Sequence, residues 1–452
     1  MGKTMKMTAK VLKLVRQSLM VAPLALAPAA SSVVLQSLGL DALSSGSAFA
    51  QEGEQEKPKY TTKKSYSLRQ NVFKDFAKVQ EKTDASDWKG ALVVLKDLEA
   101  SKGAKYTSFE KANLWNYFGW VYYSLEDYPQ SIRYYKKVLA EEELSEALEL
   151  GTLYTLAQLM FVQEDYRGAV DLLKKWMKLQ PIVGADAYVL IAQGYYQLND
   201  MNSALSNINT AVDKFESTGK VPKENWYTLQ RAIYYEKGDN KKVISILEKL
   251  IRHYPKITYW KQLSGMYGQV EQEKNQLHSL DVVYLAGELN NEKELLNLAY
   301  LYMGQDVPYK AAKIIDKGMK EGKIEKTSKN LEVLATAWRL SQDVKKSIPV
   351  MEEAASKSDK GDLYARLAGI YLDNDENKKA IEAGAKAYKR GSIKRPDQLQ
   401  IVLGMANANL KQYGKAIKEF EKAAKDKRSK KFAVQWIEFC KNEKKREDSL
   451  KS

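Results

Sequence analysis

Apolar residues recur along most of the chain at spacings of three and four, which is the pattern of one helix face. Trp115, Phe118 and Tyr122 form such a face, with the small residue Gly119 on it. Each such stretch is followed by a short polar turn and a second amphipathic stretch. The pattern predicts pairs of antiparallel helices and requires no strand. Further stretches are centred on Ala157, Ala192, Ser264, Ala299, Ala335 and Ala368.

The second stretch of each pair carries its own position for a small residue. Successive members of this series lie 33 to 40 residues apart, a period that a random chain would not hold. Small residues at matching positions let two helices approach closely. Arg231 with Val243, and Gln276, depart from the rule, so we expect the fifth and sixth pairs to pack less closely. The series is Ala91, Ser131, Ala169, Ala204, Val243, Gln276, Ala311, Ser347, Ala380 and Ala416.

This order of residue types resembles the tetratricopeptide repeat, whose pattern sets an aromatic, a leucine, a small residue and a tyrosine on the first helix. The resemblance covers about residues 70–428. It implies an all-α fold, an α-solenoid (superhelix) of about ten helix-turn-helix repeats in residues 67–428. Residues 429–452 would form a C-terminal capping helix and basic tail, with Phe432, Trp436 and Phe439 on one side.

The first residues have the form of an export signal. Cations from Lys3 to Arg16 precede an uncharged run from Gln17 to Leu40, and small residues before Gln51 fit signal-peptidase cleavage after Ala50. We therefore expect a signal peptide in residues 1–50, a flexible charged linker in 51–66 and a periplasmic location. A retained membrane anchor is the alternative for the uncharged run.

The order of segments is also similar to exported tetratricopeptide proteins of Gram-negative bacteria found beside TonB, ExbB and ExbD. This resemblance implies protein partners, including TonB, ExbB or ExbD components, and an accessory role in TonB-dependent energy transduction. An assembly factor for outer-membrane proteins, pili or the cell wall is the alternative within the binding class. The segments that carry the resemblance are residues 224–239, 259–269, 307–315 and 423–431.

Few residues are suited to catalysis or metal binding. The 452 residues include one cysteine and two histidines, and no phosphate-binding loop or hydrolase motif occurs. His253 and His278 lack a second ligand at metal-binding spacing, and a buried helical thiol is the favoured interpretation of Cys440. We therefore expect no enzyme, no cofactor and no metal. A cell-wall hydrolase is the disfavoured alternative.

The resemblance places a partner-binding groove on the first helices. In tetratricopeptide repeats the positions one and four residues after the small residue, and three before it, face the groove. Aromatic rings and amides there suit an extended peptide or a partner helix. The alternative is that these rings pack between successive helix pairs. The groove residues are Asn116, Trp120, Tyr123, Tyr154, Gln158, Phe161, Gln193, Tyr196 and Tyr235.

Positive charge marks a second candidate surface. The chain carries a formal net charge of +15, and its C-terminal part contains a basic patch. Export excludes nucleic acid as the partner, which leaves an acidic protein or peripheral contact with anionic membrane lipids. A solvated helix end with lysines is the structural alternative. The patch consists of Lys425, Lys427, Arg428, Lys430 and Lys431.

Overall fold

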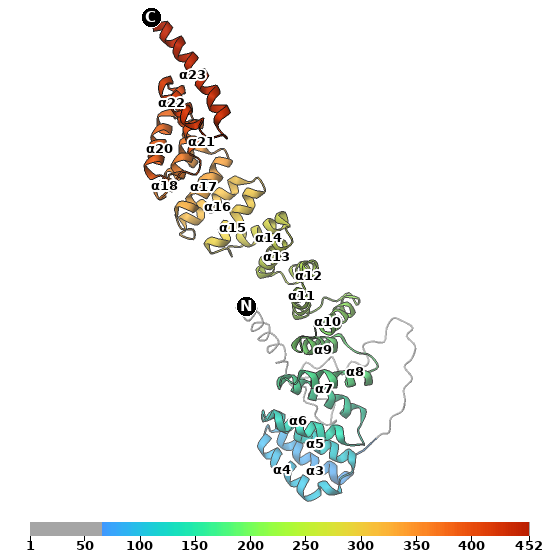
Figure 1. The fold of residues 1–452 in the computed structure, drawn as a ribbon. Helices are drawn as coiled ribbons and strands as arrows, with labels where there is room; N and C mark the ends of the chain where they lie inside the picture. Colours follow the sequence, from blue (N-terminus) through green and yellow to red (C-terminus); the bar gives the residue numbers. More distant parts are fainter. Residues whose placement is uncertain (1–65, 452) are drawn as a thin grey trace. The chain divides into compact units, whose positions relative to one another are not determined.

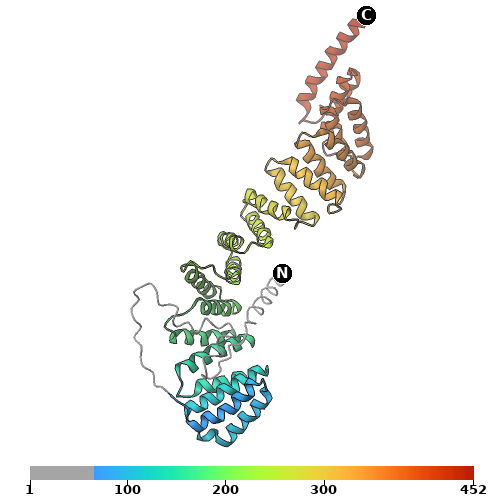
Figure 2. The same ribbon diagram turned by 180° about the vertical axis from the view of Figure 1, so that it is seen from behind.

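The computed structural model describes residues 66–451. The predicted signal peptide lies outside the described residues, as does the predicted linker apart from Tyr66. Within residues 66–451 the chain forms 21 α-helices and one short 3-10 helix, with no strand (Figures 1 and 2). The helices form successive antiparallel pairs, which confirms the predicted all-α fold, an α-solenoid of helical repeats.

The described chain divides into two compact units, residues 66–246 and 247–451, and the division falls within one helix, α12. Unit 1 begins with Tyr66, whose ring stacks on Phe109 at 5.6 Å. The helices of unit 1 are α3 (Gln70–Asp84), α4 (Trp88–Lys102), η2 (Gly103–Lys105), α5 (Ser108–Ser124), α6 (Tyr128–Ala140), α7 (Glu146–Val162), α8 (Tyr166–Leu179), α9 (Ala185–Gln197), α10 (Met201–Glu216), α11 (Glu224–Glu236) and the first part of α12 (Asn240–His253).

Unit 2 continues the pairing and ends on a single long helix. Its last helix, α23, packs against α22 through Ala433 and Cys440, which are fully buried. The helices of unit 2 after α12 are α13 (Ile257–Gln269), α14 (Glu273–Leu285), α15 (Glu292–Gly304), α16 (Pro308–Lys320), α17 (Ser328–Leu340), α18 (Val344–Ser356), α19 (Asp362–Asp373), α20 (Asn377–Arg390), α21 (Pro396–Asn409), α22 (Tyr413–Ala423) and α23 (Lys430–Lys451).

Paired helices cross where their small residues meet. The Ser131 hydroxyl of α6 donates to the Gly119 carbonyl of α5 over 2.8 Å, and Ser347 donates to the Ala335 carbonyl over 2.9 Å. A Cβ atom added at Gly119 would lie 2.8 Å from the Tyr135 ring. The two backbones are therefore close enough to exclude a larger side chain. This close approach is the packing that the period of small residues predicts.

The sixth pair, α13 with α14, crosses equally closely, so the expectation of looser packing is wrong for this pair. Ser264 on α13 donates to the backbone carbonyl of Gln276 over 3.0 Å. The long Gln276 side chain lies over Gly268, where an added Cβ would be 2.8 Å from its amide nitrogen. Because Gly268 leaves that space, the glutamine side chain turns aside and the two backbones still meet.

The turns inside the pairs share one conformation. Seven residues after the crossing position of the first helix, which is a small residue in eight of the ten pairs, the backbone adopts a positive φ. Only one of the ten positions is glycine, although a positive φ is energetically unfavourable for residues that have a side chain. The next residue is the N-cap of the second helix, and in several pairs it is an aspartate that accepts from a backbone N–H, as Asp127 does from Gln130. The ten positions are Ser86, Glu126, Glu164, Asn199, Gly238, Glu271, Asp306, Gln342, Asp375 and Lys411.

Tyrosines connect neighbouring pairs in unit 2. The Tyr267 hydroxyl on α13 donates to Glu248 on α12 over 2.8 Å, and Tyr371 on α19 donates to Glu352 on α18. Burial and the adjacent Glu248 carboxylate raise the pKa of Tyr267 to about 12. Each phenol therefore stays protonated and joins the first helix of one pair to the second helix of the pair before it.

We expect Gly119→Leu to destabilise unit 1 by about 1–3 kcal/mol, since the new side chain would overpack the crossing against Tyr135. Urea unfolding followed by circular dichroism measures the change. Gly265→Ala is the matched control, because an added Cβ at Gly265 meets no atom within 4 Å. Equal unfolding midpoints for Gly119→Leu and the wild-type chain would contradict the close crossing.

The turn between α15 and α16 lacks the aspartate cap. Val307 occupies the N-cap position and makes no side-chain cap hydrogen bond, while Pro308 follows at the first helical position. We expect Val307→Asp to stabilise unit 2 by about 1 kcal/mol, because its carboxylate can accept from the N–H of Lys310. Thermal unfolding measures the gain, with Val307→Ala as the control that cannot cap. Equal melting temperatures for the two variants would contradict a missing cap.

Candidate partner-binding surface

The residues predicted to line a groove in unit 1 lie on their first helices, but three of them are buried. Phe161 is 3% exposed and packs in the core of the α7–α8 pair, and Asn116 and Gln193 are also buried. These three side chains offer almost no contact area to a partner in this conformation.

Other predicted groove residues pack on neighbouring rings. The Trp120 ring contacts Trp88 edge-on at 5.4 Å, the Tyr123 ring lies 5.8 Å from Tyr128, and the Tyr154 ring lies 5.2 Å from Trp176. Each partner ring belongs to a second helix, of the same pair or the pair before. Packing between helices therefore accounts for much of this aromatic surface.

The remaining predicted groove residues differ in exposure. Gln158 and Tyr196 are half-buried, and burial raises the pKa of Tyr196. Tyr235, near the end of α11, is 39% exposed. A role of the nine residues in partner binding stays a prediction.

In unit 2 the same positions carry small residues and exposed rings, which the sequence analysis did not single out. One residue after the small position lie Gly265 on α13, Tyr300 on α15 and Gly369 on α19. Tyr300 is 46% exposed, and Leu340 at the end of α17 is 50% exposed. The signal was available for three of them, because Gly265, Tyr300 and Gly369 follow Ser264, Ala299 and Ala368 by one residue, a spacing used for unit 1. Leu340 lies five residues after Ala335, outside that spacing.

Internal packing does not require glycine at Gly265 or at Gly369. A Cβ added at Gly265 or Gly369 would meet no atom within 4 Å, whereas one at Gly404 would lie 2.6 Å from the Phe420 ring. Glycine in a helix interior costs about 1 kcal/mol relative to alanine. The first-helix face of unit 2, defined here by Gly265, Tyr300, Leu340 and Gly369, is therefore open in a way that internal packing does not require.

Ion pairs link consecutive first helices of unit 2. Lys261 on α13 pairs with Glu294 on α15, and Arg366 on α19 pairs with Glu332 on α17. All four side chains are at least partly exposed, so each pair contributes little stability by itself. The pairs do fix which residues of neighbouring first helices lie side by side.

One member of the predicted basic patch has a structural role. Arg428 pairs with Asp426 at 2.7 Å and with Asp397 at 3.6 Å. Asp397, buried at the start of α21, also accepts from Arg395 and from the Ser429 hydroxyl, each over 2.7 Å. Arg395, Ser429 and Arg428 together hold the pKa of Asp397 well below its usual range despite burial. Arg428 and Ser429 thus anchor the segment that leads into α23.

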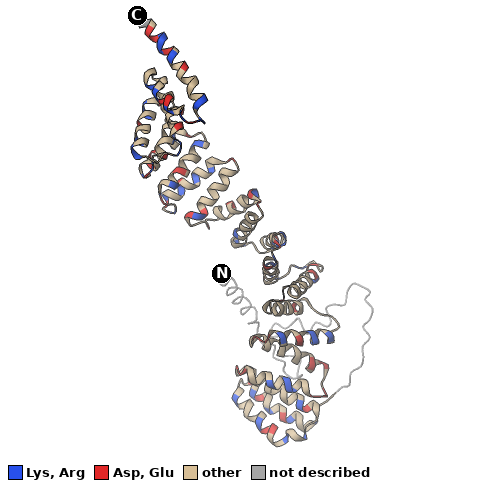
Figure 3. Cartoon of the chain, in the orientation of Figure 1, with Lys and Arg blue, Asp and Glu red and all other residues tan. Residues whose placement is uncertain are grey.

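The other four residues of the basic patch are exposed around the start of α23, where Figure 3 shows cations.

No helix in the described part of the chain is long and apolar enough to cross a membrane. Residues 66–451 also contain no cluster of three His, Cys, Asp or Glu side chains that could hold a metal ion. His253 and His278 are exposed, and burial raises the pKa of the Cys440 thiol, which disfavours the reactive thiolate.

Comparison with known proteins supports the repeat assignment. Residues 398–425, from α21 to just beyond α22, match the family model described as "Tetratricopeptide repeat". The crossing residues of this segment, Gly404 and Ala416, are twelve apart, as in the other pairs. This segment is therefore similar to a tetratricopeptide repeat, and the same helix pairing recurs through the described residues 66–451. No curated protein sequence matches the chain.

Three solved structures illustrate the similarity. MamA 41-end from Desulfovibrio magneticus RS-1 is 19% identical, with a TM-score of 0.32, and the match covers 38% of this chain and 93% of that one. YrrB, described as a TPR protein with an unusual peptide-binding site, is 18% identical, with a TM-score of 0.32 and coverage of 41% and 88%. Naa15/Naa10 bound to HypK-THB is 15% identical, with a TM-score of 0.40 and coverage of 81% and 66%.

The buried Asp397 makes a pH dependence of stability testable. Because its pKa is lowered in the folded state, its contribution is present above pH about 4, the unfolded value, and is lost as the pH falls below that. We expect Asp397→Asn to destabilise unit 2 by roughly 1–3 kcal/mol at pH 7, with a smaller difference from wild type at pH 3. Urea unfolding at the two pH values measures this.

Asp426→Asn is the matched control, because Asp426 pairs with the same Arg428 but is more exposed. Its effect should stay below about 1 kcal/mol at both pH values. A difference between Asp397→Asn and wild type that does not change with pH would contradict the role of the Asp397 charge.

Proposed function

We propose that this protein is a non-enzymatic scaffold that binds a segment of a partner protein along the first-helix face of unit 2. The observation that carries the proposal is the pair of helical glycines, Gly265 and Gly369, that face open space. Glycine allows another backbone to approach a helix closely. Tyr300 and Leu340, both exposed, supply apolar contact area on the same set of helices.

The proposed place of action is the periplasm, as an accessory of TonB-dependent energy transduction. The signal-like segment before Gln51 supports export, and the resemblance to exported proteins found beside TonB, ExbB and ExbD supports the process. A component of such a complex is the partner that we propose. The scarcity of histidine and cysteine favours binding over catalysis.

The mechanism would be presentation of preformed side chains. Tyr302, Trp338 and Tyr371 are buried side chains of the same first helices, and each packs under a lysine ammonium group of the following second helix, at 5.2, 4.5 and 5.5 Å respectively. Because the supporting rings are packed, little conformational entropy would be lost on binding. Thr336 and Arg339 lie at the equivalent positions of α17 and offer polar contacts.

The test places a photo-crosslinking amino acid at Tyr300 in the full chain and identifies crosslinked proteins in intact cells. We expect a TonB, ExbB or ExbD component among them. The control places the photo-crosslinking amino acid at Lys313, which is exposed on the second helix α16. A chain crosslinked from this position should not capture that component. Equal capture at both positions, or capture of only unrelated proteins at Tyr300, would overturn the proposal.

A pair of substitutions at Gly369 tests the open face directly. Gly369→Phe should reduce the Tyr300 crosslink at least about tenfold, because the ring would occupy the space that a partner backbone needs. Gly369→Ala should preserve the crosslink and raise stability by up to about 1 kcal/mol. If Gly369→Phe folds normally and captures the partner as the wild type does, the face is not the binding surface.

A further inference from the structure

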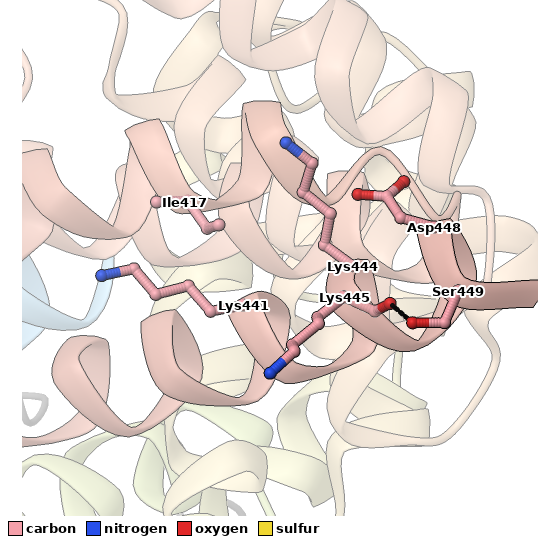
Figure 4. Close-up of a pocket in the computed structure, with 6 residues that line it drawn as sticks. All are labelled: Ile417, Lys441, Lys444, Lys445, Asp448 and Ser449. Atoms are coloured by element: carbon pink, nitrogen blue, oxygen red, sulfur yellow. Dashed lines mark hydrogen bonds between the residues drawn. The ribbon is translucent and has the colours of Figure 1, made fainter. Parts of the chain in front are cut away.

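An open pocket lies between the last two helices, away from the first-helix face. Ile417 of α22 and the side chains of Lys441, Lys444 and Lys445 of α23 line this pocket (Figure 4). Asp448 and Ser449 complete the lining, and the Ser449 hydroxyl donates to the Lys445 carbonyl over 2.9 Å. The pocket therefore combines one aliphatic side chain with a strongly charged wall.

The three lysines have no ionic partner within the described residues. Other cations nearby are paired, such as Lys422 with Glu419 at 2.7 Å and Arg446 with Glu443 at 3.6 Å. No ion pair or hydrogen bond in residues 66–449 uses the side-chain nitrogen of Lys441, Lys444 or Lys445. Three cations against the single carboxylate of Asp448 leave this wall positive.

The spacing explains why the charges gather on one side. Lys441, Lys444, Lys445 and Asp448 follow each other at i, i+3, i+4 and i+7, so they share one face of α23. Ile417 on the adjacent helix is half-buried and gives this face an apolar border. A ligand that fits both features needs several negative charges close to an aliphatic group.

We propose that this pocket binds an acidic peptide segment of a partner protein, with an aliphatic side chain of the peptide placed against Ile417 and its carboxylates paired with the three lysines. Charge complementarity selects this occupant, because the three lysines of the wall outnumber its single carboxylate, Asp448, and would attract an acidic segment. The site is distinct from the predicted basic patch, in which Arg428 is already paired.

An anionic membrane fits the geometry less well. Phe432 and Phe439, which are 43% and 49% exposed, are seven residues apart and share a face of α23. Lys441 follows Phe439 by two residues, which corresponds to about 200° around a helix. A helix that lies on a membrane needs its apolar residues to insert while its cations reach the headgroups on the same side. Here the exposed rings and the lysines point in opposite directions.

The test uses the full chain and a fluorescein-labelled peptide of glutamates around one leucine, with binding followed by fluorescence anisotropy. We expect salt-dependent binding. The triple variant Lys441→Glu, Lys444→Glu, Lys445→Glu should weaken it at least about tenfold, the combined effect of three exposed ion pairs. The triple variant Lys425→Glu, Lys427→Glu, Lys431→Glu has the same net charge and should weaken it less than about threefold.

The apolar border has its own control. A peptide with serine in place of leucine should bind several-fold more weakly to the wild-type chain, and Ile417→Ala should remove that difference.

Equal losses of peptide affinity in the two triple variants would mean general charge attraction and overturn the site. Co-sedimentation with vesicles of phosphatidylcholine and phosphatidylglycerol that depends on the three lysines, without peptide binding, would also overturn it and assign the pocket to a membrane. None of these variants changes the first-helix face. Loss of peptide binding with an unchanged Tyr300 crosslink would therefore concern this pocket alone, and loss of the Tyr300 crosslink would concern the proposed function.

Discussion

The close crossing of two helices at a pair of small residues is the constraint on which the rest of the structure depends. At Gly119 and Ser131 the backbones approach until a serine hydroxyl reaches the carbonyl of the facing helix. The two residues are always twelve apart along the chain, so the turn between them must have one length and one shape. The positive φ in every turn, and the aspartate caps that follow, are consequences of that requirement.

Much of the fold could be predicted from the sequence because crossing residues are chosen by size, which the sequence displays directly. Gln276 shows the limit of that reasoning. Its size suggested a loose pair, but the space above Gly268 depends on a neighbour one turn further along α13, and its side chain turns into that space. A rule based on one position could not include this compensation.

The candidate sites were harder to predict because repeat spacing gives the face of a residue but not what covers it. Phe161 occupies a groove position in the repeat pattern, yet it is buried in the core of its own pair. Gly369 occupies the equivalent set of positions in unit 2 and faces open space. Aromatic residues at the groove positions of unit 1 are recognisable in the sequence as candidates for binding. A glycine at such a position, as in unit 2, has no side chain and so gives no apolar signal. The same holds for the Lys441 pocket, whose apolar member belongs to another helix.

The uniform turns separate two kinds of connection in this chain. A turn inside a pair cannot gain or lose a residue, because the small residue of one helix would then face the wrong position of the other. The connections between pairs and the starts of the first helices carry no such restriction, and together they give the range of 33 to 40 residues in the repeat period. The segment from Gln180 to Gly184, with Ile182 largely exposed, is one of them. Length variation during evolution, and any inserted domain, would therefore be tolerated between pairs and not within them.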